Sequence, residues 1–160
     1  MAEDCKFTCG SSYFRFRAGA FILNDGKMLF VKSNFGDYLY VTGGAVNMCE
    51  TTEHCIIREI KEELGTDAKI ERLAVITENF FKGVGGNIDG LDCHTIEFYY
   101  IISIENADGV RGMTDDGEEL IWVPVEDIKN TNIKPSFITE RMDEILGSHS
   151  ILHIIEERDR

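Results

Sequence analysis

The sequence Gly43-Gly44-Ala45-Val46-Asn47-Met48-Cys49-Glu50 is followed, after seven residues, by Arg58-Glu59-Ile60-Lys61-Glu62-Glu63-Leu64-Gly65-Thr66. Thr51 or Thr52 can cap a helix after this first segment, because threonine side chains satisfy the free backbone N–H groups of a first turn. The helix is predicted to run to Leu64 and to stop at Gly65, since glycine commonly ends helices. The two segments therefore read as a glycine turn joined to a glutamate-rich helix.

At about 100° per residue, the predicted helix has one apolar face and a neighbouring acidic arc. The apolar face must pack on the rest of the protein. The carboxylates of Glu59, Glu62 and Glu63 share the acidic arc, and Glu63 adjoins the apolar face. A solvated surface is the ordinary explanation of such an arc, and the helix alone favours it. The apolar face consists of Ile56, Ile57, Ile60 and Leu64.

The surroundings of the acidic arc favour a metal site over a solvated surface. Carboxylates that flank a buried face line a cleft, and the preceding Gly43-Gly44 turn offers bare backbone. Hard cations such as Mg²⁺ prefer oxygen ligands, commonly a few carboxylates together with water and substrate phosphates. We therefore predict that the helix holds a divalent cation.

Residues 44–66 resemble the Nudix box, which is the signature of the Nudix hydrolase (MutT-like) family. That pattern is a glycine, five residues, a glutamate, seven residues, and then Arg-Glu-apolar-x-Glu-Glu-x-Gly-apolar, and every charged and glycine position matches. The departures are Thr66 at the last, usually apolar, position and Asn47 where many members carry a glutamate. The resemblance covers roughly residues 13–147 and includes the flanking segments Arg15-Phe16-Arg17-Ala18, Asp25-Gly26-Lys27-Met28-Leu29 and Trp122-Val123-Pro124.

The resemblance implies an α/β fold in which a mixed β-sheet is sandwiched between helices. It also implies that Glu59, Glu62 and Glu63, with the Gly43 carbonyl, bind Mg²⁺, for which Mn²⁺ can substitute. Arg58 would orient these glutamates by charge-assisted hydrogen bonds. Support of the box is expected from Gly44, Glu50 and Gly65.

The reaction that the resemblance implies is hydrolysis of a phosphoanhydride bond, in which a general base activates the attacking water. The base is either a box glutamate or a glutamate on a later loop, for which Glu118 and Glu119 are the candidates. The expected substrate is a nucleoside diphosphate linked to another moiety, in the nucleotide, ADP-ribose or sugar-nucleotide class.

Substrate contacts are less well defined by the sequence. Arg15 and Arg17 lie on one face of the first long strand, where they either meet phosphates or pair with surface acids. Phe81 and Tyr99 are candidates to stack on a base, although core packing is the more common role of such aromatic residues.

Composition limits the possible partners. The 160-residue chain carries a formal net charge of −13, which opposes binding to a nucleic-acid polymer. It contains no apolar run of the roughly 18 residues that a membrane-spanning helix needs. The acidic N-terminus shows no signal-type apolar stretch, so we expect a cytoplasmic protein. Five scattered cysteines are expected to be free thiols.

We expect an N-terminal arm at residues 1–12 and a single Nudix domain at 13–160. Asn24-Asp25-Gly26 is a strong hairpin signal, and Ser136 is a candidate helix cap. The glycine-rich segment 82–92 is expected to be a mobile loop. The predicted strands are 13–23, 27–32, 38–41, 70–81, 95–104 and 119–123, with a second helix at 136–146 and a short apolar segment at 151–155.

Two other classes of function compete with the hydrolase. One is a non-catalytic nucleotide-binding or regulatory module that kept the fold, although the chain has lost none of the box glutamates that such a module is expected to lose. The other is an acidic interaction protein without a metal. A homodimer is compatible with the sequence but is not indicated by any particular residue.

Overall fold

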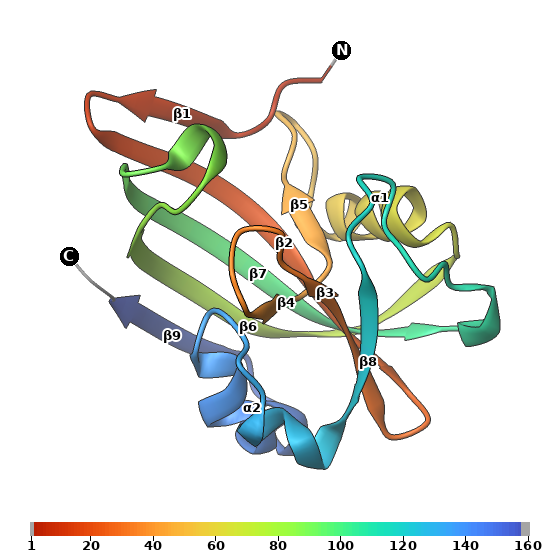
Figure 1. Ribbon diagram of the computed structural model, residues 1–160. Helices are drawn as coiled ribbons and strands as arrows, with labels where there is room; N and C mark the ends of the chain where they lie inside the picture. The colour runs from red at the N-terminus through yellow and green to blue at the C-terminus, as the bar shows by residue number, and fades with distance from the viewer. Residues whose placement is uncertain (1, 158–160) are drawn as a thin grey trace.

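The computed structural model describes residues 2–157, and within them nine strands form one mixed sheet (Figure 1). The main order is β4-β3-β2-β7-β6-β9, while β1 and β5 pair with β2 and β8 pairs with β3. The strands are β1 (Lys6–Cys9), β2 (Ser12–Asn24), β3 (Lys27–Lys32), β4 (Leu39–Tyr40), β5 (Gly43–Ala45), β6 (Ala68–Lys82), β7 (Asp92–Ile104), β8 (Leu120–Pro124) and β9 (Leu152–Glu157). The helices are α1 (Thr52–Leu64) and α2 (Phe137–Gly147), with short 3₁₀ helices η1 (Gly86–Ile88), η2 (Ala107–Gly109) and η3 (Val125–Asn130).

Three long strands form the centre of the sheet. β2 runs parallel to β7 from Ser12 opposite Asp92 to Leu23 opposite Ser103, and β6 runs antiparallel to β7. The predicted hairpin joins β2 to β3. Its turn residues Asp25 and Gly26 have φ angles of 50° and 73°, the left-handed conformations that a tight hairpin turn requires.

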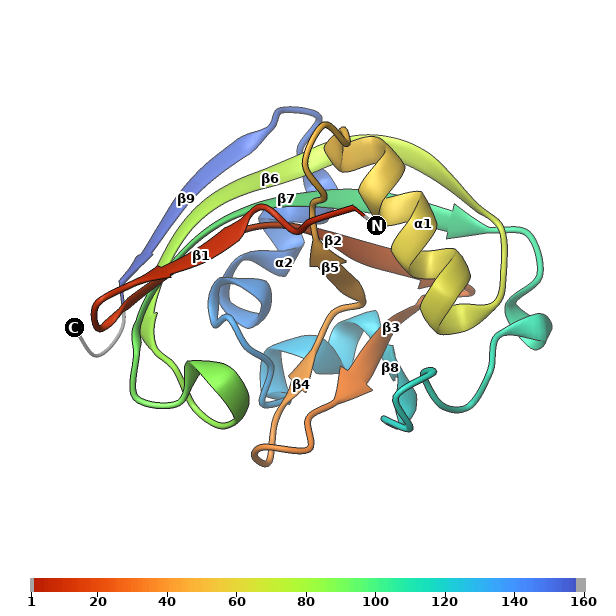
Figure 2. The same cartoon turned by 90° about the horizontal axis from the view of Figure 1, so that it is seen from above.

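Side chains alternate between the two faces of the sheet, so each face has its own core. On β2, Ala18, Ala20 and Ile22 face α1, whereas Phe21 belongs to the core that includes α2 and η3. Figure 2 shows α2 within the concave side of the curved sheet. The buried residues of α1 pack in the core on the other face. This arrangement confirms the predicted mixed sheet between helices.

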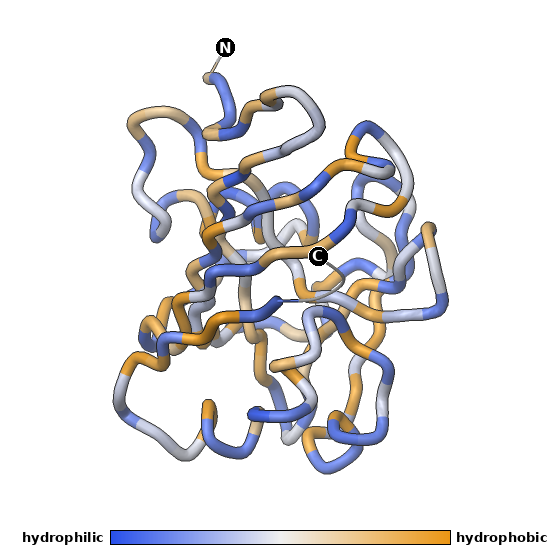
Figure 3. Tube along the Cα trace, turned by 90° about the vertical axis from the view of Figure 1, so that its left-hand side faces the viewer, coloured by the Kyte–Doolittle hydropathy of each residue, from blue (hydrophilic) through white to orange (hydrophobic). Residues whose placement is uncertain are grey.

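Apolar and polar residues are interspersed along the chain trace (Figure 3). Among residues 2–157, no helix has the length and apolar character needed to cross a membrane.

Two local expectations need correction. The segment expected to be a loose arm contains β1, which pairs with β2 from Lys6 opposite Arg15 to Cys9 opposite Ser12. Ser136 is the N-cap residue of α2, as expected, but its side chain makes no capping hydrogen bond. Instead, the carboxylate of Glu156 on β9 accepts hydrogen bonds from the Ser136 backbone N–H (2.9 Å) and the Phe137 N–H (3.2 Å). The ends of the predicted arm and domain, Met1 and 158–160, lie outside the described residues.

Candidate active site

Helix α1 begins and ends where the sequence predicts. The Thr51 side chain accepts a hydrogen bond from the His54 N–H (3.1 Å), and Gly65 ends the helix with a φ of 71°. The predicted residues Ile56, Ile60 and Leu64 are buried, and Cys55 is buried with them. The apolar face is therefore fixed on the sheet, and the glutamates are held at its margin.

A dense set of charged hydrogen bonds ties the loop before α1 to the helix. The Arg58 guanidinium donates to both carboxylate oxygens of Glu50, at 2.8 and 3.0 Å. It also donates to Glu59 (2.7 Å), to Glu62 (3.4 Å) and to the Ala45 carbonyl (3.3 Å). Arg58 thus contacts the loop and two of the three glutamates that are predicted metal ligands.

Two glycines allow the backbone of β5 to approach its neighbours closely. β5 pairs with β2, and a Cβ added at Gly43 would lie 2.1 Å from the Ala18 carbonyl oxygen. A Cβ added at Gly44 would lie 2.3 Å from Cδ of Glu59. Since real Cβ atoms essentially never come this close, the Glu59 carboxylate occupies space that only glycine leaves free.

Glu63 is a half-buried carboxyl in an acidic environment. Burial raises the pKa of Glu63 to about 8. The nearby Arg17 guanidinium opposes this rise, whereas the carboxylates of Glu59, Glu118 and Asp116 add to it. Burial also raises the pKa of Glu59, and its hydrogen bond to Arg58 opposes that rise. Two neighbouring carboxylates are therefore costly to ionise together without a cation.

The two candidate later-loop glutamates differ in their surroundings. Glu118 is half-buried, accepts a hydrogen bond from the Tyr40 hydroxyl (2.5 Å) and adds its charge to the field at Glu63. Glu119 is exposed, and its backbone carbonyl accepts from the Lys32 N–H (2.8 Å). Of the two, Glu118 faces the acidic residues of α1.

Arg17 belongs to a buried polar group beside the acids of α1. Its guanidinium donates to the Val41 carbonyl (2.9 Å) and lies 4.0 Å from the Glu97 carboxylate. Glu97 in turn accepts from the Tyr99 hydroxyl (2.8 Å) and the Thr77 hydroxyl (3.3 Å). This arrangement holds Arg17 as a fixed positive charge near Glu63.

Arg15 lies two residues before Arg17 on β2. Burial, together with the positive charge of Arg17, lowers the pKa of Arg15. Its Nε is buried without a hydrogen-bond partner among residues 2–157, and the Thr95 hydroxyl opposite it on β7 is in the same state. A buried donor without an acceptor is costly, so this position is suited to an anionic or carbonyl-bearing ligand.

The two predicted aromatic contacts differ in accessibility. Phe81 on β6 is half-buried. Tyr99 is 0% exposed and packs against Phe21 and Phe137, with ring centroids 5.2 and 5.3 Å apart. The Tyr99 ring thus has no free face for a base, and its contribution to the site is the hydrogen bond to Glu97.

Three residues near the site were not singled out from the sequence. Tyr40 positions Glu118, Asp116 adds negative charge near Glu63, and Glu97 lies opposite Arg17 in the β2–β7 register. Glu97 had a detectable signal, because it is an isolated acid in an otherwise β-prone strand. Tyr40 and Asp116 had none, because their roles depend on contacts made across the fold.

The donor set fits a divalent cation chemically. Carboxylates, with a backbone carbonyl beside them, are the ligands that Mg²⁺ prefers, and the crowded acids around Glu63 need a positive charge. Within residues 2–157, no three acidic, histidine or cysteine side chains are already arranged to hold an ion. Glu59 accepts the hydrogen bond from Arg58 on Oε1, and its second carboxylate oxygen, Oε2, would serve as the ligand atom.

The fold and the site define an α/β protein in which a helix bearing three glutamates packs beside the glycines of β5. The sequence matches the family model described as NUDIX domain over residues 13–142. The chain therefore belongs to the Nudix family of hydrolases, whose members generally use a divalent metal. A search of curated protein sequences found no match.

Solved structures of similar fold share little sequence with this chain. A MutT protein from Bacillus halodurans superposes with a TM-score of 0.66 at 15% identity, covering 88% of each chain. A UDP-X diphosphatase gives 0.62 at 17% identity, covering 89% of this chain and 66% of the other. An ADP-ribose pyrophosphatase from Streptococcus suis gives 0.58 at 14% identity, covering 89% and 98%. At these identities the likeness concerns the fold.

Proposed function

We propose that this protein hydrolyses a phosphoanhydride bond in a nucleoside diphosphate linked to another moiety. The observation that carries the proposal is the gathering of acids around Glu63. A half-buried carboxyl with a pKa of about 8, close to Glu59, Glu118 and Asp116, is an unfavourable arrangement without a bound cation. Membership of the Nudix family supports a catalytic role for that cation, because members generally use a divalent metal.

Glu59, Glu62 and Glu63, with the Gly43 carbonyl, would hold Mg²⁺, and Mn²⁺ would substitute. When bound, the ion neutralises charge on the substrate phosphate oxygens and lowers the pKa of an attacking water. Arg58 would keep the glutamate side chains within reach of the ion, and its paired hydrogen bonds to Glu50 would fix the guanidinium itself.

Glu118 is the general base that we favour among the later-loop candidates. Its carboxylate adds its charge to the field at Glu63, and Tyr40 holds it by a hydrogen bond of 2.5 Å. A carboxylate placed in this way can accept the proton of a water that attacks phosphorus. Glu119 is exposed and does not share these contacts, which leaves it the weaker candidate.

The substrate phosphates would lie between the ion and the arginines of β2. Arg15 has a buried Nε free to donate, and Arg17 brings positive charge close to Glu63. Guanidinium groups bind phosphate oxygens in a defined geometry. The names of two structural neighbours, UDP-X diphosphatase and ADP-ribose pyrophosphatase, favour a linked nucleoside diphosphate as the substrate class.

The test is a screen of ADP-ribose, UDP-glucose and deoxynucleoside triphosphates with Mg²⁺, in which the nucleoside monophosphate product is separated by ion-exchange chromatography and quantified. At least one compound should be cleaved, and EDTA should abolish the cleavage. Glu118→Gln should lower kcat by at least about 10²-fold, the lower end of the range for one acid–base group, whereas Glu119→Gln should leave it nearly unchanged. Binding of these compounds without cleavage would instead indicate a non-catalytic module.

A further inference from the structure

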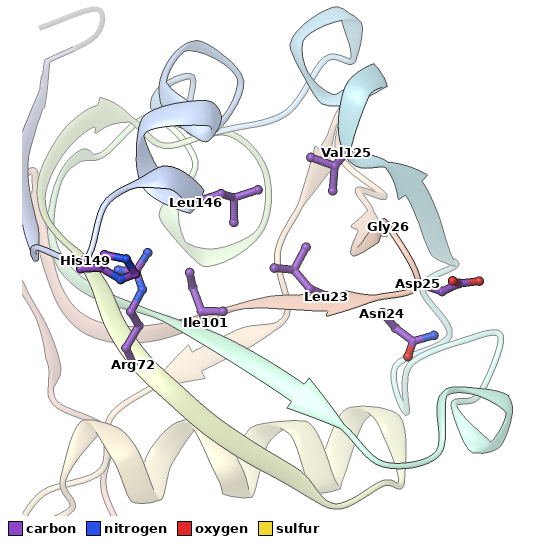
Figure 4. Close-up of a pocket in the computed structure, with 9 residues that line it drawn as sticks. All are labelled: Leu23, Asn24, Asp25, Gly26, Arg72, Ile101, Val125, Leu146 and His149. Carbon is purple, nitrogen blue, oxygen red and sulfur yellow. The ribbon is translucent and has the colours of Figure 1, made fainter.

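A pocket lies at the end of the sheet opposite the β5–α1 loop. It has a volume of ≈ 490 Å³ and lies between the β2–β3 hairpin, the start of η3 and the C-terminal end of α2 (Figure 4). Its size falls in the range of small-molecule sites. It is lined by Leu23, Asn24, Asp25, Gly26, Arg72, Ile101, Val125, Leu146 and His149.

A β-bulge in β6 directs Arg72 into this pocket. Ile70 pairs with Ile102, but Arg72 pairs with Ile101 and Leu73 with Tyr100, so the register shifts between Ile70 and Arg72. In a regular strand Arg72 would share the α1 face with Ile70. The bulge turns it to the α2 face, and a second shift follows between Leu73 and Val75. Bulges commonly re-aim a side chain at a functional position.

The Arg72 guanidinium is only partly used by the protein. Its Nη2 donates to the Ile145 carbonyl (2.5 Å), one of the last carbonyls of α2, where a positive charge is favourable. Its Nη1 is buried and has no hydrogen-bond partner among residues 2–157. The contact with the end of α2 therefore uses Nη2 of Arg72, whereas Nη1 has no acceptor among residues 2–157.

Apart from the hairpin residues Asn24, Asp25 and Gly26, which lie at the end away from Arg72 (Figure 4), the lining separates into an apolar and a basic part. Leu23 and Ile101 project from the sheet, and Leu146 and Val125 face them from α2 and η3 (Figure 4). His149 lies next to Arg72 at one end of the pocket (Figure 4). A ligand that matches both parts carries an anionic head and an apolar body.

We propose that this pocket binds a small organic acid, whose carboxylate accepts a hydrogen bond from Arg72 Nη1 while its apolar body covers Leu23, Ile101 and Leu146. The carboxylate supplies the acceptor that the buried Nη1 lacks, and hydrogen bonds to charged groups are the stronger kind. The site is separate from the acids of α1, so it does not depend on the proposed hydrolase reaction.

The test is an NMR titration of the ¹⁵N-labelled full chain with hexanoate and, separately, with hexanamide, which has the same shape and no charge. Hexanoate should shift the backbone amides of residues 23–26 and 146–149 in a saturable way. Hexanamide should bind at least about tenfold more weakly than hexanoate, because it lacks the charge-assisted hydrogen bond. Equal binding of the two compounds, or shifts centred on residues 43–63, would overturn the proposal.

Two variants act on the pocket in different ways. Arg72→Gln removes the charged donor, and Val125→Phe fills the space without touching Arg72. Each should weaken hexanoate binding at least about tenfold. The matched control Arg141→Gln removes an exposed guanidinium from the same helix region and should bind like the wild type. Glu63→Gln should also bind normally. Hexanoate binding that survives both pocket variants would contradict the assignment.

Discussion

Arg58 and Glu50, eight residues apart, are joined by two hydrogen bonds of 2.8 and 3.0 Å that connect the loop before α1 to the helix itself. The same guanidinium donates to Glu59 at 2.7 Å. One side chain therefore stabilises the conformation of the loop and also orients a proposed metal ligand. This double role makes Arg58 sensitive even to conservative replacement.

Arg58→Lys should lower the free energy of unfolding by about 2 kcal/mol, because an ammonium cannot reproduce the paired hydrogen bonds to Glu50. Chemical denaturation measures this change. The control is Arg141→Lys, since Arg141 makes the same paired contact with Glu144 at 2.8 and 2.9 Å on an exposed surface. This replacement should lower the free energy of unfolding clearly less than Arg58→Lys does, because solvent screens an exposed ion pair. Equal costs would show that the Arg58 contact has no special structural weight.

Gly44→Ala should impair the site without unfolding the protein. The new methyl group would lie 2.3 Å from Cδ of Glu59, so the carboxylate must move. A displacement of about 1 Å at a catalytic group can lower the rate by about 10²-fold. Steady-state kinetics on the best substrate of the screen measures this effect. Gly112→Ala is the control, because a Cβ there meets nothing within 4 Å; a comparable loss in both variants would contradict the steric explanation.

Cys55 should resist alkylation under conditions that modify Cys9 and Cys49. Burial raises the pKa of the Cys55 thiol to about 12, so at pH 8 only about one molecule in ten thousand carries the reactive thiolate. Cys9 and Cys49 are exposed. Iodoacetamide treatment followed by peptide mass mapping should find label on the exposed pair and on Cys55 only after denaturation. Rapid labelling of Cys55 in the native protein would show that its packing against β5 is loose.

The parts of the fold that could be predicted were those encoded by local pattern. Helix α1, its cap at Thr51 and its stop at Gly65 follow from short-range chemistry, and the Asp25-Gly26 turn follows from the need for positive φ angles. Helical spacing likewise places Glu59, Glu62 and Glu63 on one arc, whereas their role as metal ligands is expected from the resemblance to the Nudix box and stays a prediction.

The parts that could not be predicted depend on contacts between distant segments. Ser136 is the N-cap residue of α2 as expected, but the capping carboxylate comes from Glu156, about 20 residues away, which the local sequence does not reveal. Strand β1 was missed because four residues are too few for a period-two pattern to stand out, and none of the four is buried in the core. The pairing of Tyr40 with Glu118 spans 78 residues and leaves no mark on either local sequence.

Glu63→Gln should not destabilise the metal-free protein, although it removes a side chain from the proposed site. The wild-type carboxyl has an ordinary pKa of 4.5 and a folded pKa of about 8, so folding favours its neutral form. The stability of the wild type is therefore expected to fall as pH rises between these values, whereas glutamine does not titrate. Thermal melts in EDTA should show that the melting temperature of the variant, relative to that of the wild type, is higher at pH 9 than at pH 5. A variant that loses stability at pH 9 would contradict the assigned environment of Glu63.

Isothermal titration calorimetry of Mg²⁺ into the wild type and Glu63→Gln, with and without ADP-ribose, tests the cation site most directly. The account predicts saturable Mg²⁺ binding to the wild type, tightened by the nucleotide and at least about tenfold weaker in the variant. Absence of Mg²⁺ binding to the wild type in the presence of ADP-ribose and UDP-glucose, or equal binding by both proteins, would contradict it.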